Sequence, residues 1–322
     1  MRRFLTELIE KKSAIIRAIR EYFDKTGAVE VFTPHLLEYP NLDPNIYPLS
    51  VEVEKDRKIT GYLHTSPEYQ MKRILSWIKK DIYQVCHVFR DREHSDRHTV
   101  EFMMLEWYRV NKNLEELMDD TKNLFIHVSR AIHRRPEIIF KDKKYSLEEW
   151  EKITVDEAFY RYTGVYPDDR EGLYKLLRDS QIQIEGLKED DYQMNFFLVY
   201  SLFVEPHLGK DKPTFIYSYP PEFAALSVIE NGRGKRFEAY IAGIELVNGY
   251  QELTDPQQLR VRLEEEKAEK SKEGREYPID YGFIEACRNM PPSAGASLGI
   301  DRLLMVLLNK QNIRETQGLN WI

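Results

Sequence analysis

Hydrophobic and polar positions at the start of the chain repeat with the period of an α-helix. Apolar side chains between Thr6 and Lys25 recur every three or four residues, as in an amphipathic helix with one buried face. Gly27 favours the end of such a helix. The alternation over 28–34 then predicts a strand, and Pro34 marks its end or its edge because proline has no amide hydrogen to donate.

The next patterned segments predict a helix and two strands. Ser66 and Pro67 suit the N-cap and first position of a helix that runs to Ile78. The β-branched and aromatic runs 81–90 and 100–110 predict strands. The polar residues between these two runs predict a hairpin loop.

The rest of the chain alternates between helical and strand patterns around a charged, helical middle. The later elements are predicted at 114–132 (helix), 215–219, 237–247 and 251–253 (strands), and 259–271 and 299–310 (helices). Strands on both sides of the helical middle indicate one α+β domain over 1–322, with a helical insertion at about 145–212, rather than two independent domains.

Composition and charge narrow the class of protein. The chain has 322 residues, with 47 Lys and Arg against 54 Asp and Glu, so its net charge of −7 argues against gripping nucleic acid by bulk charge. No apolar stretch reaches the ~18 residues of a membrane span, so we expect no membrane helix. Glu7 and Glu10 interrupt any signal peptide, which favours the cytoplasm. Cys86 and Cys287 lie far apart in apolar surroundings, which predicts two buried thiols.

The densest polar cluster is the predicted hairpin loop at 89–98. Its three arginines can match phosphate oxygens bidentately, so the loop could surround a polyphosphate. A solvated, salt-bridged hairpin tip is the alternative. A zinc site at His87, His94 and His98 is disfavoured because no cysteine is well placed and the loop is crowded with cations.

A second cluster contains the two carboxylates Glu245 and Glu252. Their odd separation would place them on opposite faces of an ideal strand. Asn248-Gly249 is a turn or bulge signal that can bring both to one surface. Such a pair suits Mg²⁺, which takes one or two carboxylates together with substrate phosphates. A surface hairpin with two unrelated acids is the alternative.

A third cluster, at 293–305, combines small residues with the start of a helix. Small residues allow close approach of a ligand or of another backbone, and the helix places Arg302 in its first turns. Both packing and binding remain open for this segment alone.

In this order, the segments resemble the three signature motifs of class II aminoacyl-tRNA synthetases. The first helix, strand and Pro34 resemble the first motif, which forms the dimer interface in that family; 89–108 resembles the second, and 299–302 the third. The resemblance implies the catalytic core of that class, mainly an antiparallel sheet flanked by helices. Similarity to the lysyl branch is carried by 65–69, 106–108 and 245–255.

One group of lysyl paralogues is especially similar. Lysyl-tRNA synthetases carry an anticodon-binding barrel before this core, whereas here the first-motif helix begins within a few residues of Met1. A free-standing core resembles the elongation factor P lysine ligases, and 204–215 and Ser297 fit that group. This resemblance implies lysine or β-lysine as substrate, elongation factor P as acceptor and a homodimer, with tRNA not expected as a partner.

The resemblance also implies ATP and Mg²⁺ as cofactors and a role for each matching residue. Arg90, on the α-phosphate and substrate carboxylate, and Arg302, on the γ-phosphate, would be catalytic, while Glu245 and Glu252 would bind the metal. The implied ATP-binding residues are Arg90, Asp91, Arg92, His98, Thr99, Glu245, Leu246, Gly299 and Arg302. The implied residues for the lysine-like substrate are Ser66, Glu68, Glu106, Tyr108 and Glu252.

Two departures from the family pattern bear on ATP binding. Arg92 stands where the family usually has an acid, for which Glu93 could substitute, and Thr99-Val100 replaces Asn-Pro. The implied reaction forms an aminoacyl-adenylate, which the ε-amine of a lysine then attacks. Two other readings stay open: a truncated lysyl- or asparaginyl-type paralogue that makes a free amino acid or acts on tRNA, and a catalytically inactive binding module, which Arg92 favours.

Overall fold

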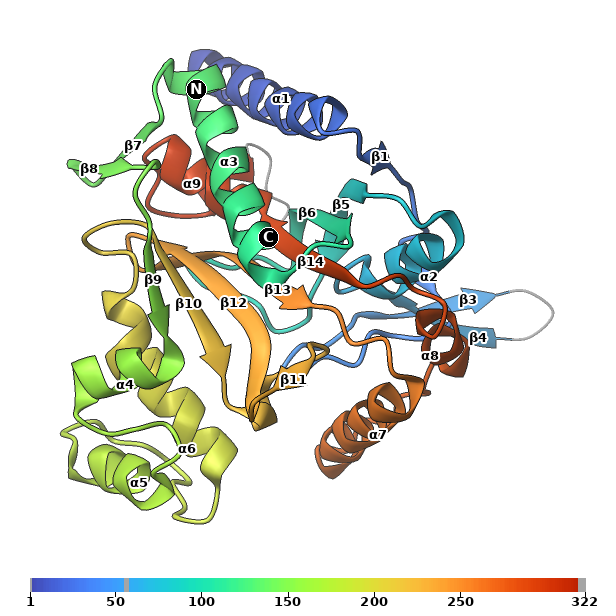
Figure 1. Cartoon of the computed structure of the whole chain (residues 1–322), viewed down its shortest axis with the longest axis vertical. Coiled ribbons are helices and arrows are strands. Elements are labelled where there is room, and N and C mark those ends of the chain that lie inside the picture. The colour runs from blue at the N-terminus through green and yellow to red at the C-terminus, as the bar shows by residue number, and fades with distance from the viewer. Residues whose placement is uncertain (1, 55–57, 318–322) are drawn as a thin grey trace.

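A mostly antiparallel sheet forms the centre of the computed structural model, which describes residues 2–54 and 58–317 (Figure 1). Within these residues, eight strands follow one another in the sheet as β1 (Val29–Glu30), β5 (Ile82–Phe89), β6 (Glu101–Val110), β14 (Ser293–Gly299), β13 (Ile244–Gln251), β12 (Arg233–Ile241), β10 (Thr214–Tyr219) and β9 (Glu151–Thr154), and β11 (Ile229–Glu230) pairs with β12. The β1–β5 and β9–β10 pairs are parallel, and the others are antiparallel. The predicted α+β class is confirmed.

Helices α1 (Arg2–Lys25), α3 (Leu114–His133) and α9 (Ile300–Leu307) pack on one face of this sheet. They bury a continuous apolar core in which Phe23, Phe125 and Leu304 meet strand residues such as Leu105 and Trp107. Because successive strand residues point to opposite faces, Glu106 and Tyr108 point away from this core. One face of β6 therefore stabilises the fold and the other is free to line a site.

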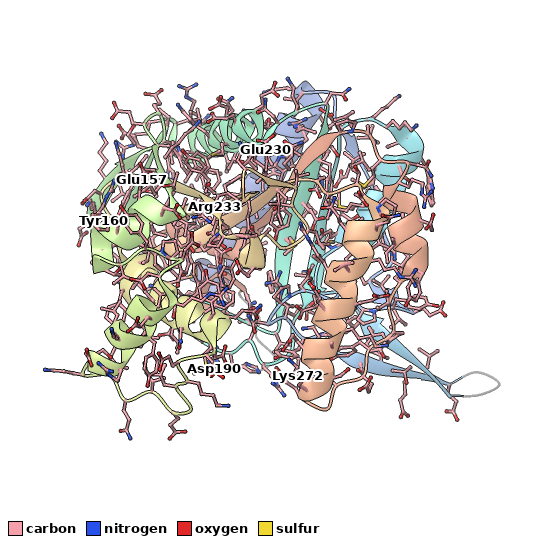
Figure 2. All side chains as sticks on the ribbon, turned by 60° about the horizontal axis from the view of Figure 1, so that its bottom comes forward. Glu157, Tyr160, Asp190, Glu230, Arg233 and Lys272 are labelled. Carbon is pink, nitrogen blue, oxygen red and sulfur yellow. The ribbon has the colours of Figure 1, made fainter. Side chains whose placement is uncertain are left out.

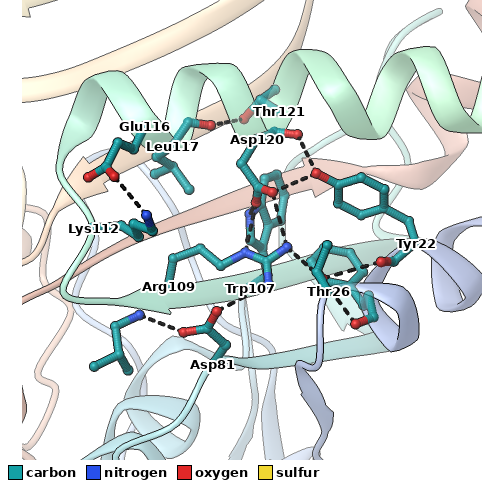
Figure 3. A network of polar contacts seen from close by, with 12 residues as sticks. Tyr22, Thr26, Asp81, Trp107, Arg109, Lys112, Glu116, Leu117, Asp120 and Thr121 are labelled. Atoms are coloured by element: carbon teal, nitrogen blue, oxygen red, sulfur yellow. Dashed lines mark hydrogen bonds and ion pairs between the residues drawn. The ribbon is translucent and has the colours of Figure 1, made fainter.

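A buried ion-pair network ties the sheet to two of these helices (Figure 3). Arg109 of β6 donates to both carboxylate oxygens of Asp120 on α3, at 2.9 and 3.0 Å, and contacts Asp81 at 3.3 Å. The same guanidinium donates to Thr26 after α1 and lies over the ring of Phe23. Bidentate pairing satisfies a charge that would otherwise be costly to bury.

Between β9 and β10 lies a helical segment with its own apolar cluster. It comprises α4 (Val155–Thr163), α5 (Arg170–Asp179), α6 (Tyr192–Val199), a π-helical turn Tyr200–Val204 and a 3₁₀ turn Glu205–His207. The segment packs against the sheet residues Ile216 of β10 and Tyr240 of β12. In Figure 2 this segment, labelled at Tyr160 and Asp190, and α7 (Pro256–Lys272), ending at Lys272, form separate flanks of the molecule.

Smaller elements surround the main sheet. They are α2 (Glu68–Ile78), α8 (Tyr281–Cys287), α10 (Arg314–Gln317), the 3₁₀ turn Pro221–Phe223, a three-stranded sheet of β2 (Leu36–Leu37), β4 (Lys58–Leu63) and β3 (Ser50–Glu54), and the hairpin of β7 (Glu137–Phe140) and β8 (Lys143–Ser146). Helix α8 packs on both α2 and α7, and the three helices contribute to one apolar cluster. No helix in the described ranges is long and apolar enough to cross a membrane.

The prediction of a turn or bulge at Asn248-Gly249 is wrong. These residues continue β13, so 251–253 is not a separate strand, and the chain turns earlier, at Ala242 and Gly243. Both turn residues have positive φ, 57° and 71°, as a two-residue hairpin turn of type I′ requires. Gly249 is instead required by packing, because a β-carbon there would collide with the ring of Phe237. The prediction failed because a glycine in the sequence can indicate either a turn or a position where packing leaves no room for a β-carbon.

The bounds of two other predicted elements differ less from the structure. The predicted strand at 28–34 is regular only at Val29–Glu30, and α2 begins at Glu68, with Pro67 rather than Ser66 as its N-cap. The hairpin loop between β5 and β6 is confirmed, as are two buried, unpaired cysteines, Cys86 and Cys287.

Candidate active site

The sheet face opposite α3 carries a cavity of about 1480 Å³. Its floor consists of side chains from β6, β12, β13 and β14, and its walls come from the segment 43–47, the start of α2, α6 and α7. Ten of the sequence-predicted positions are distributed around it as follows: Ser66, Glu68, Arg90, His98, Glu106, Tyr108, Glu245 and Glu252 line the cavity, Ser297 lies on its floor, and Arg302 contacts two lining residues, His98 and Glu245.

A bulge in β13 places Glu245 and Glu252 on the same face. Tyr240 pairs with Glu245 while the preceding Ala239 pairs with Val247, so Leu246 is one extra residue in β13. The extra residue corrects the odd spacing of the two carboxylates. The two carboxylates therefore share one surface, as expected, but the bulge is at Leu246 and not at Asn248-Gly249.

One end of the cavity holds three buried carboxylates around a buried lysine. Glu68, Glu106 and Glu252 are 9%, 3% and 4% exposed, and Lys72 of α2 is fully buried. The Lys72 ammonium contacts the carboxylate of Glu68 and lies 2.7 Å from that of Glu252. Tyr108 donates its hydroxyl hydrogen to Glu106. An ammonium group fits such a cluster, because buried carboxylates are stable only when paired or hydrogen-bonded.

Burial dominates the protonation of this acidic cluster. It raises the pKa of Glu106 well above the usual range, together with the nearby Glu68 charge. Burial also raises the pKa of Glu252 to about 7, against the opposing effect of the Lys72 ammonium. Lys72 was not predicted as a site residue. The available signal was its position four residues after Glu68 on one face of a helix.

Gly295 makes room for this end of the cavity. A β-carbon at this position would collide with the ring of Tyr108 and would lie 2.6 Å from Oε1 of Glu252. Only glycine therefore allows both side chains their observed positions, which gives the small-residue cluster on β14 a role in the site.

Two arginines and a histidine surround the other end of the cavity. Arg90 donates to the carbonyl of Thr65 at 3.2 Å and lies over the ring of Phe102. Arg302 donates to the carbonyl and carboxylate of Glu245, at 2.9 and 3.2 Å, and contacts His98. Burial and the Arg302 charge lower the pKa of His98 to about 4, so its ring is neutral at pH 7. Two cations near one cavity wall suit a polyphosphate.

Besides Arg302, five predicted ATP-binding residues lie outside the cavity lining. The side chain of Leu246 belongs to the apolar core, and Gly299 is the N-cap of α9 beside Arg302. The Asp91 amide bonds to Tyr47, and the exposed Arg92 guanidinium lies over the Tyr47 ring, 4.6 Å from its centre. The Thr99 hydroxyl donates to the carbonyl of Glu101. Their predicted contacts to ATP stay predictions.

A polar network beneath the cavity floor was also missed. Glu238 of β12 accepts hydrogen bonds from Tyr200 at 2.9 Å and Tyr240 at 2.7 Å, and it pairs with Arg236. Tyr200 begins the π-helical turn of the segment between β9 and β10. The network therefore connects that segment to the strand next to Glu245. Sequence spacing gave no signal for it, because Tyr200 lies more than 30 residues before the other members on β12.

The two predicted metal ligands differ in how well they fit Mg²⁺. The Glu245 side chain is 30% exposed, lines the cavity and forms an ion pair with Arg302, so it can accept a metal ion beside phosphates. The Glu252 side chain is 1% exposed and is already paired with Lys72. No group of three or more His, Cys, Asp or Glu side chains suited to a metal ion occurs among the described residues. Glu245 is the better ligand, since Mg²⁺ can complete its shell with phosphate oxygens and water.

The family model for class II tRNA synthetases of the D, K and N type matches residues 1–319. The chain belongs to the class II tRNA synthetase family. Within that family, a relative from Aquifex aeolicus named as an elongation factor P–(R)-β-lysine ligase homologue is 39% identical, covering 95% of this chain and 97% of the relative. Elongation factor P–(R)-β-lysine ligases from Pectobacterium carotovorum and Edwardsiella ictaluri are each 33% identical, covering 95% of this chain and 92% of each relative.

The resemblance inferred from the three motifs is confirmed by these comparisons. Membership of the class II synthetase family, with ligases among its relatives, makes the chain an ATP-dependent amino acid ligase. The match of the family model extends over nearly the whole chain.

Proposed function

We propose that this enzyme activates lysine or β-lysine as an aminoacyl-adenylate and transfers it to a lysine side chain of elongation factor P. The observation that carries the proposal is the charge arrangement of the cavity: carboxylates around Lys72 at one end and Arg90 at the other. A substrate with a side-chain ammonium and a carboxylate matches both ends. The names of the similar ligases supply the acceptor.

Activation requires positioning and charge neutralisation rather than a protein nucleophile. The substrate carboxylate would attack the α-phosphate of ATP in line, forming the C–O–P bond of the adenylate and releasing pyrophosphate. Arg90 would hold the carboxylate and α-phosphate, and Arg302 the γ-phosphate. Mg²⁺ at Glu245, when bound, would neutralise phosphate charge.

Transfer would then form an amide. The acceptor lysine, as the neutral amine, attacks the carbonyl carbon of the adenylate, and AMP leaves with the electrons of the broken C–O bond. The Glu68, Glu106 and Glu252 cluster would hold the side-chain ammonium of the adenylate away from the reacting carbon, so that this amine does not compete.

Partners follow from the same proposal. The exposed apolar side chains of Val29, Phe32 and Leu36 lie in the segment that resembles the first motif, and Phe32 is 76% exposed, which supports a homodimer through this segment. The net charge of −7 gives no support to tRNA as a partner. Elongation factor P as acceptor would place the reaction in the cytoplasm.

The test is ATP–pyrophosphate exchange with α-lysine, (R)-β-lysine, (S)-β-lysine, aspartate and asparagine, with and without purified elongation factor P and with its mass as the second readout. We expect exchange with a lysine isomer and the matching mass gain on one lysine. Exchange without a mass gain would favour a free-product or tRNA-directed enzyme, and a salt-sensitive gel shift with tRNA would identify the latter. Absence of exchange with every amino acid would support an inactive binding module.

A further inference from the structure

The transfer step proposed above needs a group that deprotonates the acceptor amine, since an alkylammonium carries no lone pair for attack. Such a base must be close to the reacting end of the cavity, unpaired by a cation, and able to exchange a proton near neutral pH. The carboxylates lining the cavity can be compared on these three requirements.

Most of these carboxylates already have a partner. Of the ten acidic residues that line the cavity, seven form an ion pair: Glu68, Glu222, Glu245, Glu252, Glu266, Glu269 and Glu273. Glu106 accepts from Tyr108 within the acidic cluster, at the end of the cavity that would hold the side-chain ammonium. Asp43 and Glu265 form no ion pair within the described ranges. Glu265 is exposed on α7, whereas the half-buried Asp43 interacts electrostatically with Arg90.

Contacts through Thr65 place Asp43 beside the reacting end. The Thr65 hydroxyl donates to Oδ2 of Asp43 at 3.4 Å, and the Thr65 carbonyl accepts from Arg90 at 3.2 Å. Neighbouring contacts fix the segment: the Asn41 amide donates to the Ser66 hydroxyl at 2.9 Å, and Lys270 donates to the carbonyl of Ile46 at 2.9 Å. Asp43 is therefore held on a cavity wall next to the arginine that would bind the substrate carboxylate.

Burial and the surrounding charges together set the protonation of the Asp43 carboxyl. The titratable and charged groups that face it are Glu68 and Tyr69 of α2, Arg90 after β5, Tyr250 of β13, and Glu266 and Lys270 of α7. Burial raises the pKa of Asp43 to about 7, and Glu68 adds to this, against Arg90 and Lys270. A base with this pKa is half ionised at pH 7, which suits proton transfer.

From this geometry we infer that Asp43 is the general base of the transfer step. The Asp43 carboxylate takes one proton from the acceptor ammonium. The resulting lone pair forms the N–C bond to the adenylate carbonyl carbon, the C–O bond to phosphate breaks, and AMP leaves. The second amine proton goes to the departing phosphate, so no other reactant is required. The inference rests on the proposed function, because it needs an adenylate in the cavity.

Asp43→Asn separates this role from binding, because the amide keeps the size of the side chain and can still accept from Thr65. The variant and the wild type are given lysine and ATP, exchange is measured, and the adenylate is then presented to butylamine or to hydroxylamine in a single turnover. Butylamine is protonated at neutral pH, whereas hydroxylamine is not. We expect normal exchange and normal hydroxamate formation, with butylamine transfer reduced by about 10²-fold.

The pH dependence gives a second readout. Wild-type transfer to butylamine should rise with pH to about 7 and then level, as Asp43 becomes ionised. In Asp43→Asn the rate should rise without levelling, because only the rare neutral amine reacts. Glu266→Gln is the matched variant: it removes a nearby negative charge that raises the pKa of Asp43, so the levelling should move to lower pH with the same limiting rate.

Each of the other possible results would overturn the assignment of Asp43 or the proposed function. If Asp43→Asn lowered the pyrophosphate exchange rate as much as the transfer rate, Asp43 would be a substrate-binding residue. If it lowered the transfer rates to butylamine and to hydroxylamine equally, Asp43 would be a contact to the adenylate. An unchanged butylamine profile in Asp43→Asn would exclude it as the base. Absence of exchange in the wild type would instead overturn the proposed function. The small amines make the test independent of whether elongation factor P is the acceptor.

Discussion

The ammonium of Lys72 lies 2.7 Å from the carboxylate of Glu252, with both side chains almost completely excluded from solvent. The same ammonium contacts Glu68, one turn earlier on α2. One cation thus joins α2 to the end of β13 and holds together two of the three carboxylates proposed to recognise the substrate. Burial raises the pKa values of Glu106 and Glu252, and a second ammonium bound in the cluster would favour their ionised forms.

Lys72→Met should destabilise the fold strongly. The change keeps most of the apolar stem but leaves two buried carboxylates without their cation, and breaking a buried ion pair in this way costs roughly 3–5 kcal/mol of unfolding free energy. Urea unfolding measures the loss. Arg260→Met is the control, because it breaks an exposed pair with Glu264 and should cost below about 1 kcal/mol. Equal, small losses in both variants would show that the Lys72 pairs contribute little.

Glu68→Gln should weaken the lysine-like substrate far more than ATP. The amide keeps the shape of the side chain but loses the charge that faces the ammonium, and a hydrogen bond to a charged group contributes about 1.5–3 kcal/mol, or roughly a 10- to 100-fold rise in KM for lysine. Pyrophosphate exchange at varied lysine and varied ATP provides both constants. If the KM for ATP rose as much as that for lysine, Glu68 would not be a specific ammonium ligand.

Arg302→Ala should nearly abolish pyrophosphate exchange. Its guanidinium, held by Glu245, is proposed to neutralise the γ-phosphate, and removing one such group typically costs about 10²–10³ in rate. Arg288→Ala, an exposed arginine on the far end of α8, serves as the control and should exchange normally. Normal exchange by Arg302→Ala would refute the assignment.

The fold was predictable where each segment had one dominant pattern. The amphipathic period of α1 and the two apolar runs of β5 and β6 are local signals, and the structure has these elements close to the predicted bounds. The hairpin of β12 and β13 was missed because its turn uses Ala242, which is not a usual left-handed residue, while Gly249 satisfies a packing requirement. Local patterns do not distinguish these two uses of glycine.

The site was predictable where a motif fixes a residue by its neighbours in sequence. Arg90, Glu245 and Arg302 are such residues, and they lie together. Lys72 and Asp43 were missed because their roles depend on contacts to Glu252 and Thr65, across the fold. A lysine on a helix and an aspartate in a loop are ordinary surface residues until the tertiary structure buries them against particular partners.

Acid should destabilise the fold through His64, whose ring is fully buried and bonds through Nε2 to the carbonyl of His87 at 2.7 Å. Burial lowers the pKa of His64 to about 4, whereas an unfolded histidine has a pKa of about 6.5. Between these values the unfolded chain binds more protons, so stability falls as pH falls. Lowering the pH from 7 to 5 should cost about 2 kcal/mol of unfolding free energy from this residue.

Replacing the ring tests this, because other groups titrate over the same range. His64→Gln keeps a donor for the His87 carbonyl but cannot take up the proton. Urea titrations at pH 7 and pH 5 give the unfolding free energy that each protein loses on acidification. This loss should be about 2 kcal/mol smaller in the variant than in the wild type. The exposed His94→Gln serves as the control and should match the wild type. If His64→Gln also matched it, protonation of His64 would not be what weakens the fold in acid.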